Sequence, residues 1–335
     1  MVTVHDVAAR SGVSIATVSR TLREPHRVTE ETRVRVLAAV AELDYRPNRA
    51  ASSLRRGRTG VIALVVPDIE NPYFASLTKG AQAISRQRGY GLVVVDTTER
   101  ADVEAEEISA LRSQVDGFIL ASSRLGDDAL RDVVGSAVCV LLNRDLDTDG
   151  ENPPTVTIDE AAAGRAAIGH LHALGHRRIV YVGGPSRSWS QGRRAKGIRD
   201  AARTLDDVVL TELSGYDPDA DGGRSAAAEA LTSDPTAVIA YNDLVALGLL
   251  AQWSEDGIRV PRDVSLMGFD DTYVAQTSSP RLTSVGADLR VFGERAVLLL
   301  LDRIDSGTSP AASEHLQLLP ELVARDSTGR PASSD

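Results

Sequence analysis

Residues 3–23 constrain the fold of this chain most, because they hold two short helix patterns separated by a single glycine. Thr3 stands three residues before Asp6, which is the hydroxyl and carboxylate spacing of a helix start. Gly12 provides a turn, and Ser14 is placed to cap a second helical segment. A helix, a tight turn and a second helix at this spacing predict a helix-turn-helix, whose second helix can enter the DNA major groove.

The second segment separates into packing positions and outward positions. Val18 and Leu22 lie at the spacing that packs against Val7 and Ala8 of the first segment. The positions expected to face outward are Ile15, Ala16, Thr17, Ser19 and Arg20. The hydroxyls among them suit phosphate oxygens, and an arginine can hold guanine in a bidentate contact worth about 1–3 kcal/mol of discrimination. Ile15 and Ala16 can sense only a thymine methyl group or the shape of the groove. A small three-helix domain with incidental arginines is the alternative.

A third helix and a short connecting stretch follow. The helix is predicted to begin at Thr29 and to end before Pro47. Its apolar face is expected to comprise Val36, Leu37, Val40 and Leu43. Residues 48–58 are too short for a helix that is stable alone, so we expect them to order only against a partner. Leu54, flanked by arginines, suits insertion between base steps in the minor groove, and a flexible linker is the alternative.

Charge is divided unevenly along the chain. The 335 residues carry a net charge of −10, which taken alone argues against a nucleic-acid partner. Residues 1–59 nevertheless contain eleven arginines against six carboxylates, a net charge of +5, so the remaining residues carry −15. Positive charge is therefore concentrated in the segment that is predicted to meet phosphates.

From Gly60 onward, apolar strand patterns alternate with amphipathic helices. Residues 60–66 form a continuous apolar run of the kind found in buried parallel strands. Further strands are predicted at residues 92–95, 118–121, 138–142, 179–183, 238–241, 264–268 and 315–319, with helices between most of them. The alternation predicts two doubly wound α/β lobes.

We therefore expect three segments: an all-α helix-turn-helix domain at 1–47, a hinge helix at 48–58, and a two-lobed α/β core at 59–335. Lobe one should comprise about residues 59–159 and 289–318, and lobe two about residues 160–288 and 319–330. Cys139 is the only cysteine, so no internal disulfide can form. No signal peptide or membrane-length apolar run is present in the sequence, and a cytoplasmic location is expected.

Polar and aromatic residues follow several of the predicted strands, where ligands of such sheets bind. The candidate ligand-binding residues are Tyr73, Phe74, Ser122, Asp159, Trp189, Arg194, Tyr216, Asn242 and Asp270. Carboxylates and a guanidinium can bind vicinal hydroxyls, and an aromatic ring can cover the apolar face of a sugar. As an alternative, Asn242 and Asp270 cap helices or form turns, and Trp189 belongs to the core.

Residues 3–57 resemble the LacI/GalR (lac repressor) family of bacterial transcription regulators, and the resemblance continues through the core. It rests on Asp6-Val7-Ala8, Gly12-Val13-Ser14, Ala16-Thr17-Val18-Ser19-Arg20, Tyr45-Arg46-Pro47-Asn48 and Leu54. The expected DNA contacts are Thr3, Ser14, Ile15, Ala16, Thr17, Ser19, Arg20, Asn48, Leu54 and Arg55. By the resemblance Ile15, Ala16 and Arg20 read bases, Leu54 opens a central base step, and the effector contacts include Phe74, Asp159, Arg194, Asn242 and Asp270. Arg23 stands where the family usually has asparagine.

The resemblance implies a two-lobed fold like that of a periplasmic sugar-binding protein, and a repressor that binds a pseudo-palindromic operator as a homodimer and is released by a sugar. A purine-type corepressor system is the first alternative, since Tyr73 and Phe74 are compatible with a stacked base. A sugar-binding transport module is the second. His170, His172 and His176 raise the question of zinc, because the last two stand one helical turn apart, but no further ligand lies near them in sequence. No cofactor and no enzymatic activity are expected, and the sequence leaves dimer and tetramer open.

Overall fold

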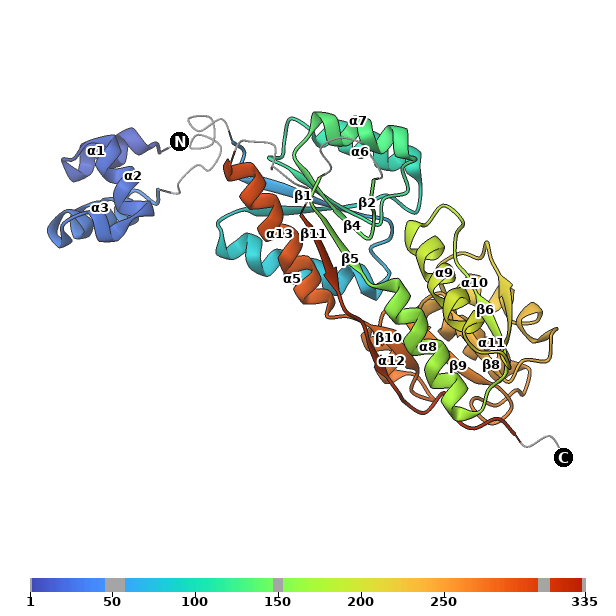
Figure 1. The fold of residues 1–335 in the computed structure, drawn as a ribbon. Helices are drawn as coiled ribbons and strands as arrows, with labels where there is room; N and C mark the ends of the chain where they lie inside the picture. The colour runs from blue at the N-terminus through green and yellow to red at the C-terminus, as the bar shows by residue number, and fades with distance from the viewer. Residues whose placement is uncertain (1, 46–57, 147–152, 307–313, 333–335) are drawn as a thin grey trace. The chain divides into compact units, whose positions relative to one another are not determined.

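The structure, a computed structural model, describes residues 2–45, 58–146, 153–306 and 314–332. The chain divides into two compact units, Met1–Thr59 and Gly60–Asp335 (Figure 1). Nearly all of the predicted hinge helix at 48–58 lies outside the described residues, and so do Asn48, Leu54 and Arg55.

The N-terminal unit contains the predicted helix-turn-helix. Its helices are α1 (Val4–Ser11), α2 (Ile15–Arg23), a 3-10 turn (Pro25–Arg27) and α3 (Glu30–Glu42). The backbone nitrogen and the hydroxyl of Thr3 both donate to the Asp6 carboxylate at 2.8 Å. Gly12 adopts φ 67° at the turn, and the Ser14 hydroxyl accepts the Thr17 amide at 3.1 Å. The predicted caps at Thr3 and Ser14 are therefore confirmed.

The structure modifies one expectation about side-chain direction in this unit and contradicts another. Ile15, expected to face outward, is partly exposed and also packs against the core formed by Val7, Val18 and Val36, because it stands one helical turn before Val18. Leu37, expected in the apolar face of α3, is 43% exposed. Ala39 is buried in its place, since residues 36, 39, 40 and 43 follow the helical repeat and residue 37 lies about 100° away from residue 36.

The first lobe of the core is a six-stranded sheet in the order β11-β5-β4-β3-β1-β2, with every neighbouring pair parallel. The strands are β1 (Val61–Val66), β2 (Gly91–Asp96), β3 (Phe118–Ala121), β4 (Cys139–Leu142), β5 (Thr155–Ile158) and β11 (His315–Leu318). The helices are α5 (Pro72–Gln87), α6 (Ala101–Leu111), α7 (Asp127–Ser136) and α13 (Leu289–Ser306). One face of the sheet packs with α5 and α13 and the other with α6 and α7.

The second lobe is a sheet in the order β12-β10-β9-β8-β6-β7, parallel except for β12. Its strands are β6 (Arg178–Val182), β7 (Val209–Leu213), β8 (Ala237–Ala240), β9 (Ser265–Phe269), β10 (Thr283–Gly286) and β12 (Glu321–Val323). Its helices are α8 (Glu160–Leu174), α9 (Trp189–Arg203), α10 (Ala220–Ala226), α11 (Asp243–Glu255) and α12 (Tyr273–Thr277), with a 3-10 turn at Glu229–Leu231. Two apolar clusters, one on each face, form its core.

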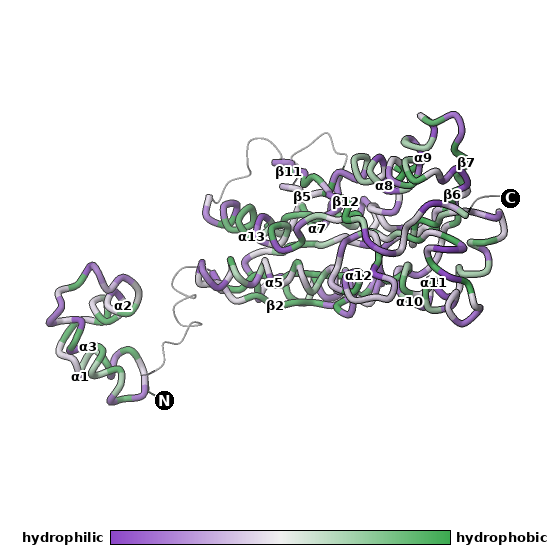
Figure 2. Tube along the Cα trace, turned by 90° about the horizontal axis from the view of Figure 1, so that it is seen from below, coloured by the Kyte–Doolittle hydropathy of each residue, from purple (hydrophilic) through white to green (hydrophobic). Residues whose placement is uncertain are grey.

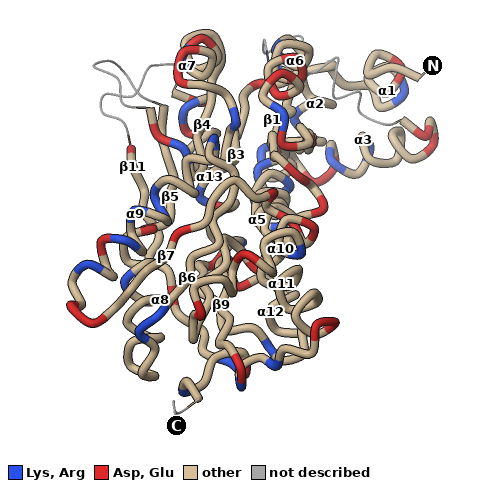
Figure 3. The backbone as a smooth tube through the Cα atoms, turned by 90° about the vertical axis from the view of Figure 1, so that its right-hand side faces the viewer, with Lys and Arg blue, Asp and Glu red and all other residues tan. Residues whose placement is uncertain are grey.

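The chain crosses between the lobes three times, after β5, after β10 and after β11 (Figure 1). Green hydrophobic and purple hydrophilic stretches alternate along the helices, as along α5 and α13, which pack against each other (Figure 2). Acidic residues are frequent on α6 and α7, as expected from the net negative charge of the two-lobed part of the chain (Figure 3). In the part of the chain that the structure describes, no helix is long and apolar enough to cross a membrane.

Candidate functional site

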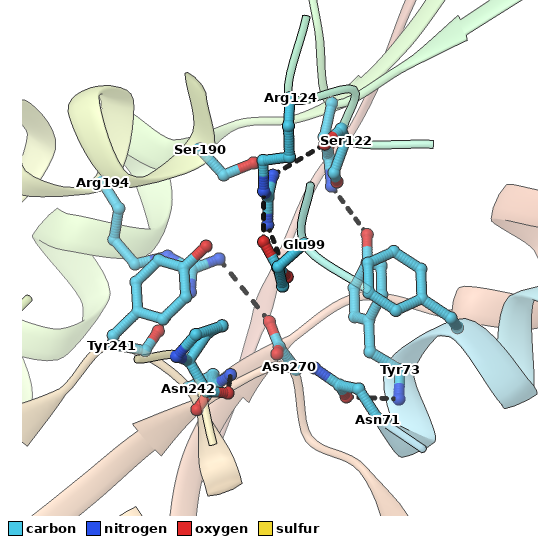
Figure 4. A pocket seen from close by; sticks show the side chains of 13 residues that line it. Asn71, Tyr73, Glu99, Ser122, Arg124, Ser190, Arg194, Tyr241, Asn242 and Asp270 are labelled. Atoms are coloured by element: carbon cyan, nitrogen blue, oxygen red, sulfur yellow. Dashed lines mark hydrogen bonds and ion pairs between the residues drawn. The ribbon is translucent and has the colours of Figure 1, made fainter. Parts of the chain in front are cut away.

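A pocket lies between the two lobes of the core and is lined by residues from both. It encloses about 380 Å³ of empty space, part of which is open to solvent. Lobe one contributes Asn71, Tyr73, Phe74, Glu99, Ser122, Arg124 and Asn143. Lobe two contributes Ser190, Arg194, Pro218, Tyr241, Asn242 and Asp270 (Figure 4). Most of these residues directly follow strands or begin helices, as the strand-end rule predicts.

The aromatic part of the lining comes from the start of α5. Asn71 caps this helix by accepting the Tyr73 amide at 2.9 Å. The rings of Tyr73 and Phe74 meet edge to face, with centroids 5.0 Å apart. The Asn143 amide donates to the Tyr73 hydroxyl oxygen at 2.7 Å. Burial raises the pKa of Tyr73 well above its usual range, so this phenol stays neutral and can donate its proton.

Arg124 is neutralised within lobe one. Its Nε and Nη2 atoms donate to the two carboxylate oxygens of Glu99 at 2.5 and 2.9 Å (Figure 4). Its Nη1 donates to the Ser122 carbonyl oxygen at 2.6 Å, and its backbone nitrogen donates to buried Glu104 at 2.8 Å.

Ser122 has φ 51° and Asn143 has φ 45°, left-handed conformations that non-glycine residues keep only where the surroundings impose them.

Arg194 is the centre of the lobe-two wall. Its Nε and Nη2 atoms each donate to Glu160 at 2.9 Å, and its Nη1 donates to the Tyr241 carbonyl oxygen. Nη2 also lies 3.5 Å from an Asp270 oxygen (Figure 4). The guanidinium carbon is 4.4 Å from the centre of the Phe269 ring, so the group is stacked as well as paired.

A second buried carboxylate, Asp243, anchors the loop that follows Asp270. Asp243, behind the pocket, accepts the backbone amide and the hydroxyl of Thr272 at 2.7 and 2.9 Å. It also accepts the Ser284 hydroxyl at 2.7 Å. Burial raises the pKa of Asp243 to about 7, and the charge of Asp270 adds to the effect. Burial likewise raises the pKa of Asp270 to about 6, which nearby Glu160 reinforces and Arg194 opposes.

The structure brings together six of the nine predicted ligand-binding residues. They are Tyr73, Phe74, Ser122, Arg194, Asn242 and Asp270. Asn242 also caps α11 by accepting the Val245 amide at 2.8 Å, so both of its proposed roles are combined.

The other three lie outside the lining. Asp159 caps α8, accepting the Ala162 amide at 2.9 Å. Trp189 begins α9 and stacks with Arg193, whose guanidinium carbon lies 5.0 Å from the ring centre. Tyr216 donates to Glu229 at 2.6 Å and packs against the lobe-two core.

Several lining residues were missed by sequence reasoning. They are Asn71, Glu99, Arg124, Asn143, Ser190, Pro218 and Tyr241. Asn143 and Tyr241 directly follow β4 and β8, so the strand-end rule could have found them. Glu99 carries no such signal, because it lies in the turn after β2 and meets Arg124 only through the fold.

The predicted DNA-reading residues of α2 are accessible to differing degrees. Ala16 and Arg20 are exposed, and Thr17 and Ser19 are partly exposed. The hydroxyls of Ser14 and Thr17 share a hydrogen bond of 2.9 Å, and Thr3 is exposed.

The histidines that raised the question of zinc have separate partners. His172 bonds to Asp207 at 3.0 Å, whereas buried His176 lies between Thr236 at 3.0 Å and the Gly329 carbonyl at 2.8 Å. Among the described residues no group of three potential ligands is close enough to hold a metal ion.

A helix-turn-helix unit joined to a two-lobed core with a polar pocket between the lobes defines a DNA-binding regulator with a small-molecule site. Residues 3–48 match the family described as "Bacterial regulatory proteins, lacI family", and residues 168–328 match a periplasmic binding protein-like domain. The transcriptional regulator DegA of Bacillus subtilis (strain 168) is 32% identical, over 97% of this chain and 98% of its own.

Solved structures of similar proteins match this chain over nearly its whole length. The lac repressor dimer bound to operator and the anti-inducer ONPF has a TM-score of 0.84 at 28% identity, covering 98% of this chain and 99% of that one. The complex of the transcriptional regulator CelR with cellobiose has a TM-score of 0.71 at 31% identity, covering 98% of this chain and 100% of that one. The chain therefore belongs to the LacI family of bacterial transcription regulators, as its sequence motifs predicted.

Proposed function

We propose that this protein represses carbohydrate-utilisation genes, binds a pseudo-palindromic operator as a homodimer, and is released from it by a sugar. The observation that carries the proposal is the pocket itself, where the Asp270 carboxylate and the Arg194 guanidinium line the same space as the Phe74 ring. The Asp270 carboxylate, which lies 3.5 Å from Arg194, can accept hydrogen bonds from vicinal hydroxyls, and the ring can cover an apolar sugar face.

The similar structures support the sugar ligand and the binding of an operator by a dimer. The CelR structure holds cellobiose, and the lac repressor structure is a dimer on its operator. A two-fold symmetric dimer places two recognition helices on half-sites related by the same symmetry, which predicts the palindrome.

The mechanism we propose is linkage between the pocket and the hinge at residues 48–58. A ligand that contacts both lobes favours one angle between them, because Tyr73 and Ser122 lie on one side of the pocket and Arg194 and Asp270 on the other. The angle in turn sets the spacing of the two hinges of a dimer, and with it their ability to order in the minor groove. Such coupling is typically worth about 1–3 kcal/mol, a 5–150-fold change in operator affinity.

A second candidate is a purine-type corepressor system, in which the ligand strengthens DNA binding. It is favoured by the two adjacent rings of Tyr73 and Phe74 in the lining. The direction of the ligand effect on operator binding separates the two candidates.

The test is to sequence genomic fragments captured by the purified, ligand-free protein. We expect enrichment of a palindrome upstream of sugar-uptake or glycosidase genes, and release of that fragment by one of the sugars those genes handle. The variant Arg20→Ala serves as the control and should lose the enrichment. Enrichment that requires an added purine, and is absent without it, would contradict the proposal and establish the corepressor system.

A further inference from the structure

We propose that the pocket selects an uncharged polyhydroxyl ligand and rejects phosphorylated sugars, because both of its guanidinium groups are already neutralised by carboxylates of the protein. This inference rests on the proposed function, in that it takes the pocket between the lobes as the effector site. It narrows the effector from sugars in general to those without a phosphate ester.

Arg194 is not available to a phosphate. Its side chain is 6% exposed and that of its partner Glu160 is 4% exposed, and two hydrogen bonds of 2.9 Å join them. A phosphate that took this guanidinium would leave the Glu160 carboxylate buried without its counter-charge, which is the costly way to break a buried ion pair.

Arg124 is committed in the same manner. Its side chain is 5% exposed, and Glu99 holds it by both carboxylate oxygens while the Ser122 carbonyl takes a third donor. The bidentate geometry that an arginine offers to a phosphate is therefore already used by a carboxylate of the same shape.

The remaining charge at the pocket is negative. Glu99, Glu160 and Asp270 supply three carboxylates at or directly behind the lining, against the two guanidiniums of Arg124 and Arg194. Within the described part of the chain, the Asp270 carboxylate has one polar side-chain contact, 3.5 Å to Arg194, so its oxygens can accept hydrogen bonds from ligand hydroxyls. A phosphate ester would face this carboxylate and be repelled by it.

Helix N-termini, the other common phosphate sites, are capped here. Three helices, α5, α9 and α11, begin at or beside the lining. Their caps Asn71, Ser188 and Asn242 accept the amides of Tyr73, Gln191 and Val245 at 2.9, 3.2 and 2.8 Å. In each helix a side chain of the protein thus already accepts one of the amides that an anion would use.

Besides the Asp270 carboxylate, two neutral hydroxyls of the lining keep hydrogen-bonding capacity for a ligand. Ser190 is 6% exposed, lines the pocket, and its hydroxyl oxygen has no hydrogen-bond partner among the described residues (Figure 4). A buried hydroxyl without a partner costs free energy that a bound ligand would recover. The Tyr73 hydroxyl accepts from Asn143 and keeps its own proton to donate. Neutral donors and acceptors together with the Asp270 carboxylate match the hydroxyls of an unmodified sugar.

The first arm of the test titrates the full-length protein calorimetrically with glucose, ribose and cellobiose, and with glucose 6-phosphate, ribose 5-phosphate and inorganic phosphate. We expect each phosphate ester to bind at least about tenfold more weakly than its unphosphorylated parent wherever the parent binds, and inorganic phosphate to give no binding heat. A phosphate ester that binds as tightly as its parent, or tighter, overturns the inference.

The second arm does not depend on which sugar is the effector. Glu99→Gln removes the charge that neutralises Arg124, and we expect inorganic phosphate and glucose 6-phosphate to bind this variant at least about tenfold more tightly than wild type. The matched control is Glu255→Gln, because Glu255 pairs with Arg224 on the surface and lies outside the lining. It should bind phosphate no better than wild type. Equal phosphate binding by wild type and Glu99→Gln overturns the inference.

The two proposals fail in different ways. If phosphate esters bind tightly, the inference is wrong, but operator capture and release by a ligand remain, with a phosphorylated effector in place of a neutral one. Failure of the proposed function appears instead as the absence of an operator, or of any ligand effect on it, whatever the charge of the ligands that bind the pocket.

Discussion

Glu160 holds Arg194 by two hydrogen bonds of 2.9 Å, and both side chains are buried at the wall of the pocket. Glu160 is the first residue of α8, directly after the crossover that follows β5, whereas Arg194 lies on α9 and reaches Asp270 in the lining. One ion pair therefore joins the pocket to the segment at which the two lobes connect.

Breaking the ion pair of Glu160 and Arg194 should lower the free energy of unfolding and weaken the response to ligand. Glu160→Gln removes the charge that compensates buried Arg194, and we expect a loss of about 3–5 kcal/mol in the free energy of unfolding. The exposed pair of Arg199 and Glu212 offers a control, since Glu212→Gln should cost less than about 1 kcal/mol. Chemical denaturation of the two variants beside wild type measures the difference. Similar small losses in both would show that the buried pair contributes no more than a surface pair.

The buried carboxylates predict an unusual dependence of stability on pH. Burial holds the pKa of Asp243 in the folded protein at about 7, above the ordinary aspartate value of 3.8, so folding takes up a proton at this site. The stability that this uptake contributes is present in full below about pH 4 and is lost as the pH rises through 7, at about 1.4 kcal/mol per pKa unit. Asp243→Asn removes the effect. The melting temperature of the variant minus that of wild type should therefore become more positive between pH 4 and pH 7. A difference that stays constant over this range would contradict the assignment.

Sequence reasoning found the buried strands that are continuous apolar runs and missed buried strands that contain threonine and serine. The predicted strands at 118–121, 138–142 and 238–241 correspond to β3, β4 and β8, which are buried along their whole length. β5 (Thr155–Ile158) and β10 (Thr283–Gly286) are equally buried, but their threonines and serine gave no apolar run. They are strands because neighbouring strands pair with them, and a local pattern does not contain that information.

The candidate site, too, could be predicted from the sequence only in part. Ser122, Asn242 and Asp270 follow predicted strands, and the strand-end rule therefore placed them. The rule does not say which residue after a strand enters the pocket: Asn242 both lines the pocket and caps α11, whereas Asp159 only caps α8 and the next residue, Glu160, holds Arg194. The pairing of Glu99 with Arg124 joins two loops 25 residues apart and could be seen only in the folded chain.

The position of Asp270 should depend on the absence of a side chain at residue 286. A Cβ atom at Gly286 would lie 2.5 Å from the Asp270 carbonyl oxygen and 2.7 Å from the Asp271 Cβ, closer than atoms can approach. Gly286→Ala should therefore displace Asp270, weaken ligand binding at least about tenfold, and destabilise the core by about 1–3 kcal/mol.

Gly126→Ala is the matched control for this substitution. Gly126 precedes α7, has φ −64°, and a Cβ there would meet nothing within 4 Å. We expect its effect on stability to stay within about 0.5 kcal/mol. Ligand titration and denaturation of the two variants test the pair, and wild-type ligand affinity in Gly286→Ala would contradict the proposed role of the 270–286 contact.

Recognition of the operator should depend on Arg20 more than on other arginines of the N-terminal unit. Arg20 is exposed on α2, three residues after Thr17, on the helix that is predicted to enter the major groove. Arg20→Ala should weaken operator binding by about 1–3 kcal/mol while leaving binding to unrelated DNA almost unchanged, because a bidentate contact to guanine reads sequence. Arg35 on α3 provides the comparison, since it is exposed and lies 3.9 Å from Glu31. Any loss in Arg35→Ala should be equal on operator and unrelated DNA. Gel-shift titrations of both variants on both DNAs at one salt concentration give the ratio of specific to non-specific affinity, and a ratio that is unchanged in Arg20→Ala would rule out base reading by this residue.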